Sequence, residues 1–168
     1  MGSLAGKTLF ISGASRGIGL AAATTLAEAG AHVVLTSRKA DACAEVVAAI
    51  RGAGGEALAV PAHLGESEDA ERLAAATVEA FGGIDIVVNN AGFTWDRTAQ
   101  NMTDEQWDDV LAVHLKAPFR VARAAIQYLR PVVKAEQKAG SAPCRKVVNI
   151  SSISGDVVSI HRGDYCLS

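Results

Sequence analysis

The chain has 168 residues, of which 49% are hydrophobic, and its formal net charge is −2 at pH 7. This length and composition suit one domain with its own apolar core, and the small net charge gives no reason to expect nucleic acid or an anionic membrane as a partner. The apolar runs are too short and too interrupted for a transmembrane helix. The N-terminus also lacks the apolar core of a signal peptide, so we expect a cytoplasmic protein that does not associate with membranes.

The three cysteines, Cys43, Cys144 and Cys166, are odd in number and far apart. Such spacing fits neither a disulfide framework nor a metal site, so we expect reduced thiols and no bound metal. Packing is the favoured role for Cys166 as well, because free cysteines are commonly buried.

The first half of the chain alternates short apolar runs with helix-like stretches. Residues 8–12 form an apolar run that ends at a glycine, which predicts a buried strand. The alanine- and leucine-rich stretch 17–29 predicts a helix that also stops at a glycine. A second strand is expected over 32–36, a helix over 41–51 that is capped by its first residue, and a third strand over 57–60.

The second half continues this alternation. A helix over 67–81 starts at a serine and ends at a pair of glycines, and a strand over 84–89 follows. A threonine with a glutamine three residues later predicts a capping box for a long helix over 103–129, which the following proline bends or ends. The polar stretch 134–145 contains glycine and proline and predicts a loop, and a fifth strand is expected over 146–150.

Strands that alternate with helices require a parallel sheet with helices on both faces. With right-handed crossovers, the five strands form a doubly wound α/β fold of the Rossmann type in the order 3-2-1-4-5. We expect residues 1–168 to form one domain of this kind, and the further strands of the six-stranded version to be missing from the sequence.

Three glycines, Gly13, Gly17 and Gly19, lie between the first predicted strand and the first predicted helix. Glycines at this point allow a tight turn and let the backbone approach a pyrophosphate, while the helix N-terminus offers free N–H groups to the phosphates. The alternative is an ordinary glycine turn of an α/β protein. The strand before the turn and the helix after it favour nucleotide binding.

Basic residues stand where a dinucleotide fold recognises the adenosine ribose. The second strand is followed by Ser37, Arg38 and Lys39, with no acidic residue before Asp41, and Arg16 adds a guanidinium inside the glycine turn. An acidic residue at this place binds a free 2′-hydroxyl, whereas a basic one accommodates a 2′-phosphate. The residues therefore predict NADP, with NAD as the alternative cofactor, unless Arg38 and Lys39 are merely solvated loop charges.

Four motifs in this order resemble the short-chain dehydrogenase/reductase family. They are the glycine pattern that begins at Ser12, the run Asn89-Asn90-Ala91-Gly92 after the fourth strand, Ser152 after the fifth, and Tyr165 thirteen residues later. The resemblance covers the whole chain and is to the 3-oxoacyl-carrier-protein reductase and hydroxysteroid dehydrogenase branches. It implies cofactor contacts from Gly13, Ser15, Arg16, Gly17, Ile18, Gly19, Ser37, Arg38, His63, Leu64, Asn89, Ala91 and Gly92.

The resemblance also implies a mechanism. Ser152 would fix the substrate oxygen, and Tyr165 would donate a proton to it as a hydride reaches the carbonyl carbon. The family places a lysine four residues after its tyrosine, which here is position 169, beyond the last residue. We therefore expect the sequence to be cut inside this motif and the 168-residue chain to be inactive.

Two histidines stand where the family has other polar residues. His63 replaces an aspartate that binds the adenine amino group, and since neutral imidazole can still accept a hydrogen bond, we expect adenine binding to be weaker rather than lost. His114 replaces an asparagine that anchors the water of the proton relay. It is a candidate catalytic residue, and a satisfied core histidine is an equal alternative.

Together these features predict an NADP(H)-dependent oxidoreductase that interconverts a ketone and a secondary alcohol, with a small-molecule substrate and a homo-oligomeric full-length form. Two alternatives stay open. One is a non-catalytic dinucleotide-binding or regulatory module, and the other is non-redox chemistry, such as epimerisation, on the same fold.

Overall fold

The computed structural model describes residues 4–95, 97–141 and 143–152. Its strands are β1 (Thr8–Ser12), β2 (His32–Thr36), β3 (Glu56–Ala59), β4 (Ile86–Asn89) and β5 (Lys146–Asn149). All five are parallel and lie in the order β3-β2-β1-β4-β5. The predicted fold class and strand order are confirmed.

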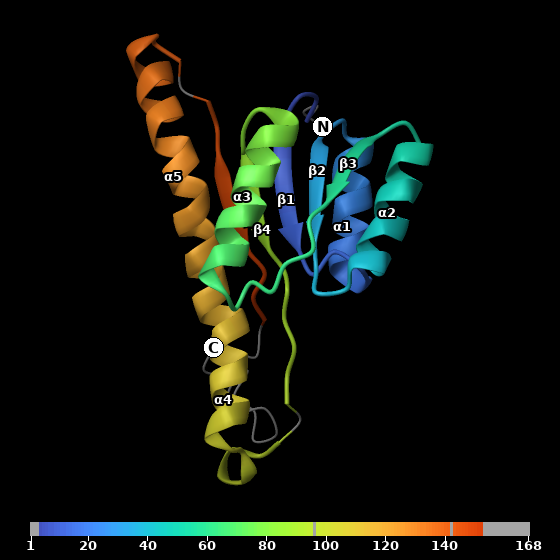
Figure 1. The fold of residues 1–168 in the computed structure, drawn as a ribbon, viewed down its shortest axis with the longest axis vertical. Helices are drawn as coiled ribbons and strands as arrows, with labels where there is room; N and C mark the ends of the chain where they lie inside the picture. The colour runs from blue at the N-terminus through green and yellow to red at the C-terminus, as the bar shows by residue number, and fades with distance from the viewer. Residues whose placement is uncertain (1–3, 96, 142, 153–168) are drawn as a thin grey trace.

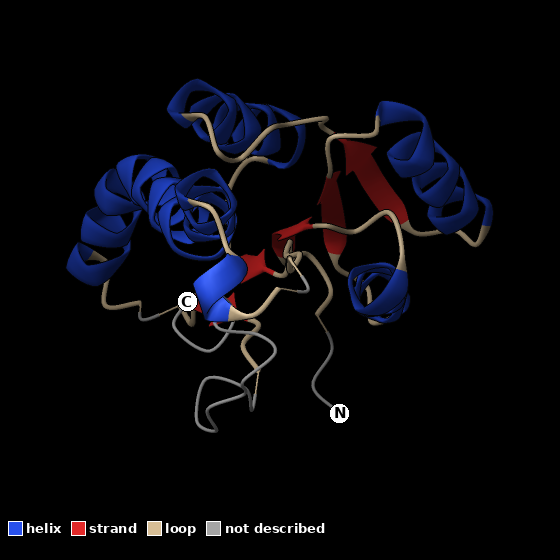
Figure 2. Cartoon of the chain, turned by 90° about the horizontal axis from the view of Figure 1, so that it is seen from below, coloured by secondary structure: helices blue, strands red, loops and turns tan. Residues whose placement is uncertain are grey.

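Four helices cover the two faces of this sheet: α1 (Gly17–Glu28), α2 (Ala40–Gly52), α3 (Ser67–Phe81) and α5 (Ala117–Lys138). The described residues also form the short 3₁₀ helix η1 (Ala99–Asn101), the helix α4 (Asp104–Leu111) and the π-turn η2 (Ala112–Lys116). Helices α1 and α2 lie on one face, and α3 and α5 lie on the other (Figure 1). A view along the sheet shows the same layers, with helices on each side of the strands (Figure 2).

Alternate residues of the central strands supply the two apolar layers. In β1, Leu9 and Ile11 pack with α1 and α2, whereas Phe10 packs with α3 and α5, because successive strand side chains point to opposite faces. The edge strand β5 differs from β1, since all four of its residues are exposed and Val147 is 53% exposed. Within the described part of the chain, burial therefore falls from the centre of the sheet to the β5 edge.

Helices α4 and α5 join through η2 into one continuous helical rod, residues 104–138, whose α4 end extends beyond the sheet (Figure 1). The predicted capping box begins this rod. The Thr103 hydroxyl accepts from the Gln106 N–H at 3.3 Å, and the Gln106 amide oxygen accepts from the Thr103 N–H at 3.2 Å. The π-turn, in which one extra residue widens a helical turn, was not anticipated from the sequence.

The prediction of a loop over 134–145 is wrong for its first part. Helix α5 passes through Pro131 and ends only at Lys138, where Gly140 adopts φ 74°. The residues after Pro131 include alanine, glutamate, glutamine and lysine, which are good helix formers despite their polarity. The end of α5 is also tied to the chain before β5, because Arg145 donates to both carboxylate oxygens of Glu136, at 2.7 and 2.8 Å.

The expected N-cap of α2 is also wrong. Lys39 is the N-cap residue, and Asp41 lies inside the first turn. The Ser37 hydroxyl accepts from the N–H of Lys39 itself at 3.1 Å, and among the described residues no side chain makes a capping bond to the first turn of α2. Within the described ranges, no helix combines the length and the apolar character needed to cross a membrane.

Candidate cofactor and active site

The turn between β1 and α1 leaves the N-terminus of α1 open. Gly13 (φ 67°) and Gly17 (φ 57°) both have left-handed backbone, which glycine adopts without strain. Arg16 is the N-cap residue, its side chain makes no capping bond, and the first turn of α1 contains no acidic residue. Because the first N–H groups of a helix have no partners within it, they and the helix dipole can bind an anion such as a phosphate.

Two of these glycines also let the turn pack directly on the chain that follows β4. A Cβ on Gly19 would lie 2.3 Å from the carbonyl oxygen of Gly13 and 2.5 Å from Nδ2 of Asn90. A Cβ on Gly13 would lie 2.8 Å from the Cα of Ala91. Any side chain at either position would therefore separate the two segments.

Hydrogen bonds from Ser12 and Asn90 fix this contact. The Ser12 hydroxyl accepts from the N–H groups of Asn90 (3.0 Å) and Ala91 (2.9 Å), and the Asn90 amide donates to the carbonyl oxygens of Ser12 (2.9 Å) and Gly13 (3.3 Å). Neither Ser12 nor Asn90 is among the site residues predicted from the sequence. Their positions inside the glycine and asparagine motifs could have marked them as site residues, but only the tertiary structure shows that they are hydrogen-bonded to each other.

The neighbouring Asn89 has a different task. Its side chain is buried, and its amide donates to Oδ1 of Asn149 at 2.8 Å, which links the ends of β4 and β5. The Asn89 carbonyl also accepts from the Ile150 N–H at 2.9 Å. These bonds show how Asn89 supports the sheet, and its contact with a cofactor stays a prediction.

The basic residues lie beside the glycine turn. Ser12 and Thr36 are paired across β1 and β2, so the segments carrying Arg16 and Arg38 start side by side at the carboxyl ends of these strands. Both arginines are exposed, whereas the hydroxyl of Ser37 is used locally, by the Lys39 backbone and by the Cys43 thiol at 3.4 Å. Of the remaining predicted contacts in the turn, Ser15 is half-buried and Ile18 is 71% exposed.

The segment after β3 brings His63 to the same edge of the sheet. The His63 N–H donates to the Asp69 carboxylate at 2.6 Å, and Arg72 donates to that carboxylate at 2.7 Å. These two donors, the His63 N–H first, lower the pKa of Asp69 below its ordinary value. The His63 ring is exposed and lies against Gly65, while Leu64 packs on the apolar layer of α3 and α5.

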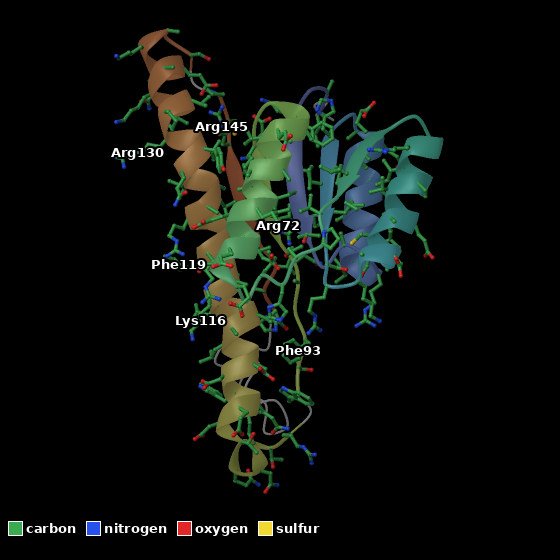
Figure 3. The ribbon with its side chains drawn as sticks, viewed as in Figure 1. Arg72, Phe93, Lys116, Phe119, Arg130 and Arg145 are labelled. Carbon is green, nitrogen blue, oxygen red and sulfur yellow. The ribbon has the colours of Figure 1, made fainter. Side chains whose placement is uncertain are left out.

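His114 lies in the middle of the π-turn and contacts the backbone after β4. Its Nε2 is 2.8 Å from the carbonyl oxygen of Phe93 and 3.2 Å from the Phe93 nitrogen, so either tautomer of the ring has a partner. A Cβ on Gly92 would lie 2.6 Å from its Cε1. Figure 3 labels Phe93, which lies on the loop segment that follows β4. His114 thus has the contacts of a satisfied, half-buried histidine, and a catalytic role stays a prediction.

The proposed active-site residues are only partly described. Ser152 is half-buried and follows β5 by three residues, at the same edge of the sheet as the glycine turn. Tyr165 and Cys166 lie outside the described residues. In the part of the chain that the structure covers, no cluster of histidine, cysteine or carboxylate side chains could hold a metal ion.

Comparison with known proteins agrees with this geometry. The family model described as "short chain dehydrogenase" matches residues 7–168. The chain belongs to the short-chain dehydrogenase family. It is 40% identical over 167 residues to a hydroxyacyl-CoA dehydrogenase of Mycobacterium tuberculosis, covering 96% of this chain and 52% of that protein.

Solved structures of this family share the fold. A short chain dehydrogenase from Mycobacterium avium aligns with a TM-score of 0.89 and 37% identity, over 99% of this chain and 61% of that one. A metagenomic short-chain oxidoreductase in complex with NADP aligns with a TM-score of 0.86 and 34% identity, over 99% of this chain and 71% of that one. The chain therefore spans about half the length of its curated relative and somewhat more of these two solved structures.

Proposed function

We propose that this protein is an oxidoreductase that uses NADP(H) to interconvert a ketone and a secondary alcohol. The observation that carries the proposal is the open glycine turn at the N-terminus of α1 with two exposed arginines beside it. The turn excludes side chains at Gly13 and Gly19, the first turn of α1 holds no acid, and Arg16 and Arg38 are exposed. A dinucleotide with an extra phosphate fits this arrangement.

Each part of such a cofactor has a candidate partner at the carboxyl edge of the sheet. The α1 N-terminus would hold the pyrophosphate, and Arg16 and Arg38 would bind the 2′-phosphate, because the guanidinium fork suits phosphate geometry. His63 and Leu64 follow β3, where the adenine would lie. When bound, the cofactor would supply or accept the hydride.

The chain's own residues would handle the substrate oxygen. Ser152 would donate a hydrogen bond to it. Tyr165 would donate a proton to this oxygen when a ketone is reduced and accept the proton when an alcohol is oxidised. A relative is named a hydroxyacyl-CoA dehydrogenase, which supports an alcohol-bearing small molecule as the substrate class. Cytoplasmic location and homo-oligomerisation belong to the same proposal.

A cofactor titration tests the arginines. We expect NADPH to bind about tenfold to a hundredfold more tightly than NADH, because a charge-assisted phosphate contact contributes roughly 1.5–3 kcal/mol. Arg38→Ala should remove most of this preference while leaving NADH affinity unchanged, and Arg51→Ala on α2 is a matched control. Equal affinities for the two cofactors would overturn the assignment of NADP.

An assay of NADPH consumption with a panel of ketones tests the chemistry, and it is run on a form of the chain that is extended beyond Ser168. Turnover that falls about 10²–10⁴-fold in Tyr165→Phe, with unchanged NADPH affinity, would support Tyr165 as the proton donor. Tight NADPH binding without turnover of any ketone or alcohol would favour the non-catalytic binding module instead.

A further inference from the structure

The loop between β2 and α2 carries Arg38, and its backbone is hydrogen-bonded to two neighbouring segments. The Thr36 carbonyl oxygen accepts from the N–H of Gly13 at 2.8 Å, and the Ser37 carbonyl oxygen accepts from the N–H of Ala62 at 3.2 Å. These bonds join the loop to the glycine turn and to the segment after β3, at the carboxyl edge of the sheet (Figure 1). The backbone that leads to Arg38 is therefore fixed from both sides.

The Ser37 hydroxyl closes the loop around Arg38. It accepts from the Lys39 N–H at 3.1 Å and donates to the Lys39 carbonyl oxygen at 3.2 Å, so the two residues that flank Arg38 are bonded to each other. It also accepts from the Cys43 thiol of α2 at 3.4 Å. A serine hydroxyl has one proton to donate and two lone pairs that accept. All three are used within the chain, and no proton is left for a phosphate oxygen.

Cys43 connects this loop to the protein core. Its side chain is completely buried in the apolar layer that contains α1 and α2, whereas Arg38 and Lys39 are exposed. The Cys43 N–H also donates to the Lys39 carbonyl oxygen, at 3.4 Å. A side-chain group and a backbone group of Cys43 therefore both bind the loop. Because side chains in a close-packed interior have little freedom, the thiol holds the Ser37 hydroxyl in one orientation.

The guanidinium of Arg38 is available to a ligand. Within the described residues it takes part in no hydrogen bond or ion pair, and the residue is exposed. An arginine on a flexible loop loses conformational entropy when it binds, which weakens the contact. A loop whose backbone is already fixed lowers this cost, because fewer torsions remain to be ordered.

We propose that Ser37 and Cys43 are positioning residues for Arg38, which they hold where it meets the 2′-phosphate of NADP. The inference rests on the proposed function, in which Arg38 binds that phosphate. It gives the Ser37 hydroxyl an indirect role in place of the direct cofactor contact that the family resemblance implies. The preference for NADPH over NADH then depends on a buried thiol that touches neither cofactor.

A double-mutant cycle on cofactor affinity separates this role from direct binding. Ser37→Ala should weaken NADPH binding about threefold to tenfold, as loss of hydrogen bonds does, and change NADH binding less than about twofold. In an Arg38→Ala background the same substitution should leave NADPH affinity almost unaltered, because Ser37 acts only through Arg38. Ser37→Thr keeps the hydroxyl and should retain the wild-type ratio of the two affinities. Thr24→Ala, which removes a hydroxyl bonded within α1, is the matched control and should retain it too.

Cys43 provides a second, independent change. Cys43→Ala removes the thiol and should lower the ratio of NADPH to NADH affinity about twofold to threefold, since a thiol is a weak donor. Cys43→Ser leaves a donor at the same place and should retain the ratio, even where the polar substitution lowers the stability of the fold. A role in packing alone would alter the stability of both variants and leave the ratio unchanged in both, which would contradict the proposal.

Amide hydrogen exchange at Lys39 tests the loop without any cofactor. The Lys39 N–H should exchange at least about fivefold faster in Ser37→Ala than in the wild-type chain or in Ser37→Thr, because it loses its acceptor. Equal exchange in all three proteins would overturn the locked loop.

The cofactor titrations have separate outcomes for the two proposals. A wild-type chain that prefers NADPH through Arg38, but keeps this preference in Ser37→Ala, would overturn the positioning role alone. So would an equal loss of NADPH affinity from Ser37→Ala with and without Arg38, which would make the hydroxyl a direct ligand. A wild-type chain with no preference for NADPH would overturn the assignment of NADP and, with it, the role of Ser37 and Cys43.

Discussion

The β1–α1 turn and the π-turn of the rod both contact the short segment that follows β4. The first contact is made mainly by backbone atoms, and the second is made by a side chain. At the β1–α1 turn, Gly13 and Gly19 bring backbone against backbone, and Ser12 and Asn90 provide the hydrogen bonds. At the π-turn, a side chain fills the space, since the His114 ring occupies the volume over a glycine and bonds to the backbone of Phe93.

This difference decides what each turn can still bind. The β1–α1 turn satisfies its own contact and leaves the N–H groups at the start of α1 for a ligand. The π-turn satisfies the Phe93 backbone with a group of the chain itself. One turn therefore leaves helix N–H groups open, whereas the other attaches η2 to the segment after β4, and each contact can be disrupted separately.

The largest effect is expected from Gly19→Ala. The added Cβ would lie 2.3 Å from the Gly13 carbonyl oxygen, so the turn and α1 must move apart. We expect unfolding stability to fall by about 1–3 kcal/mol and NADPH affinity to fall at least about tenfold. Gly52→Ala in α2 is the matched control, because nothing lies within 4 Å of its new Cβ and alanine favours a helix. Chemical denaturation measures the change in stability, and cofactor titration measures the change in NADPH affinity. A Gly19→Ala variant with wild-type stability and affinity would contradict the described packing.

A smaller, coupled effect is expected at the π-turn. Gly92→Ala would place a Cβ 2.6 Å from Cε1 of His114, and we expect it to destabilise the wild-type chain by about 1–3 kcal/mol. In a His114→Ala background the ring is gone, so the same change should cost much less. Denaturation of the two single variants and the double variant gives the coupling energy. Additive effects would mean that the ring does not occupy this space.

The smallest effect concerns acid stability near His63. The His63 N–H and Arg72 keep the pKa of Asp69 below its ordinary value of about 3.9. A carboxyl whose pKa is lower in the folded state stabilises the fold above its unfolded pKa, and this contribution is lost as the pH falls through the folded pKa. The melting temperature of wild type should therefore exceed that of Asp69→Asn by no more than about 2–4 °C at pH 6–7, because the pair is exposed. This difference should shrink as the pH falls below the ordinary value of about 3.9 and disappear once Asp69 is protonated in the folded protein as well. A constant difference across that range would point to a cause other than ionisation.

The sequence by itself determined the strand order, the glycine turn, the capping box at Thr103 and the family, because each of these has a local signature. Alternating apolar runs predict parallel strands, and a glycine at a strand end predicts a turn wherever it occurs. The extension of α5 beyond Pro131 does not follow from the polar pattern of residues 134–145, which favours a loop, whereas the helix propensities of these residues favour a helix.

The tertiary structure alone decided which groups meet. Asn90 bonds to the glycine turn, Asn89 bonds to Asn149, and His114 bonds to Phe93. The residues of the first two contacts are more than 50 positions apart in the chain. Contacts between residues so far apart depend on the register of neighbouring strands and the packing of helices on them, and these arise only when the sheet is assembled. The π-turn also involves such a contact, since it contains His114, whose ring bonds to Phe93 in the segment after β4.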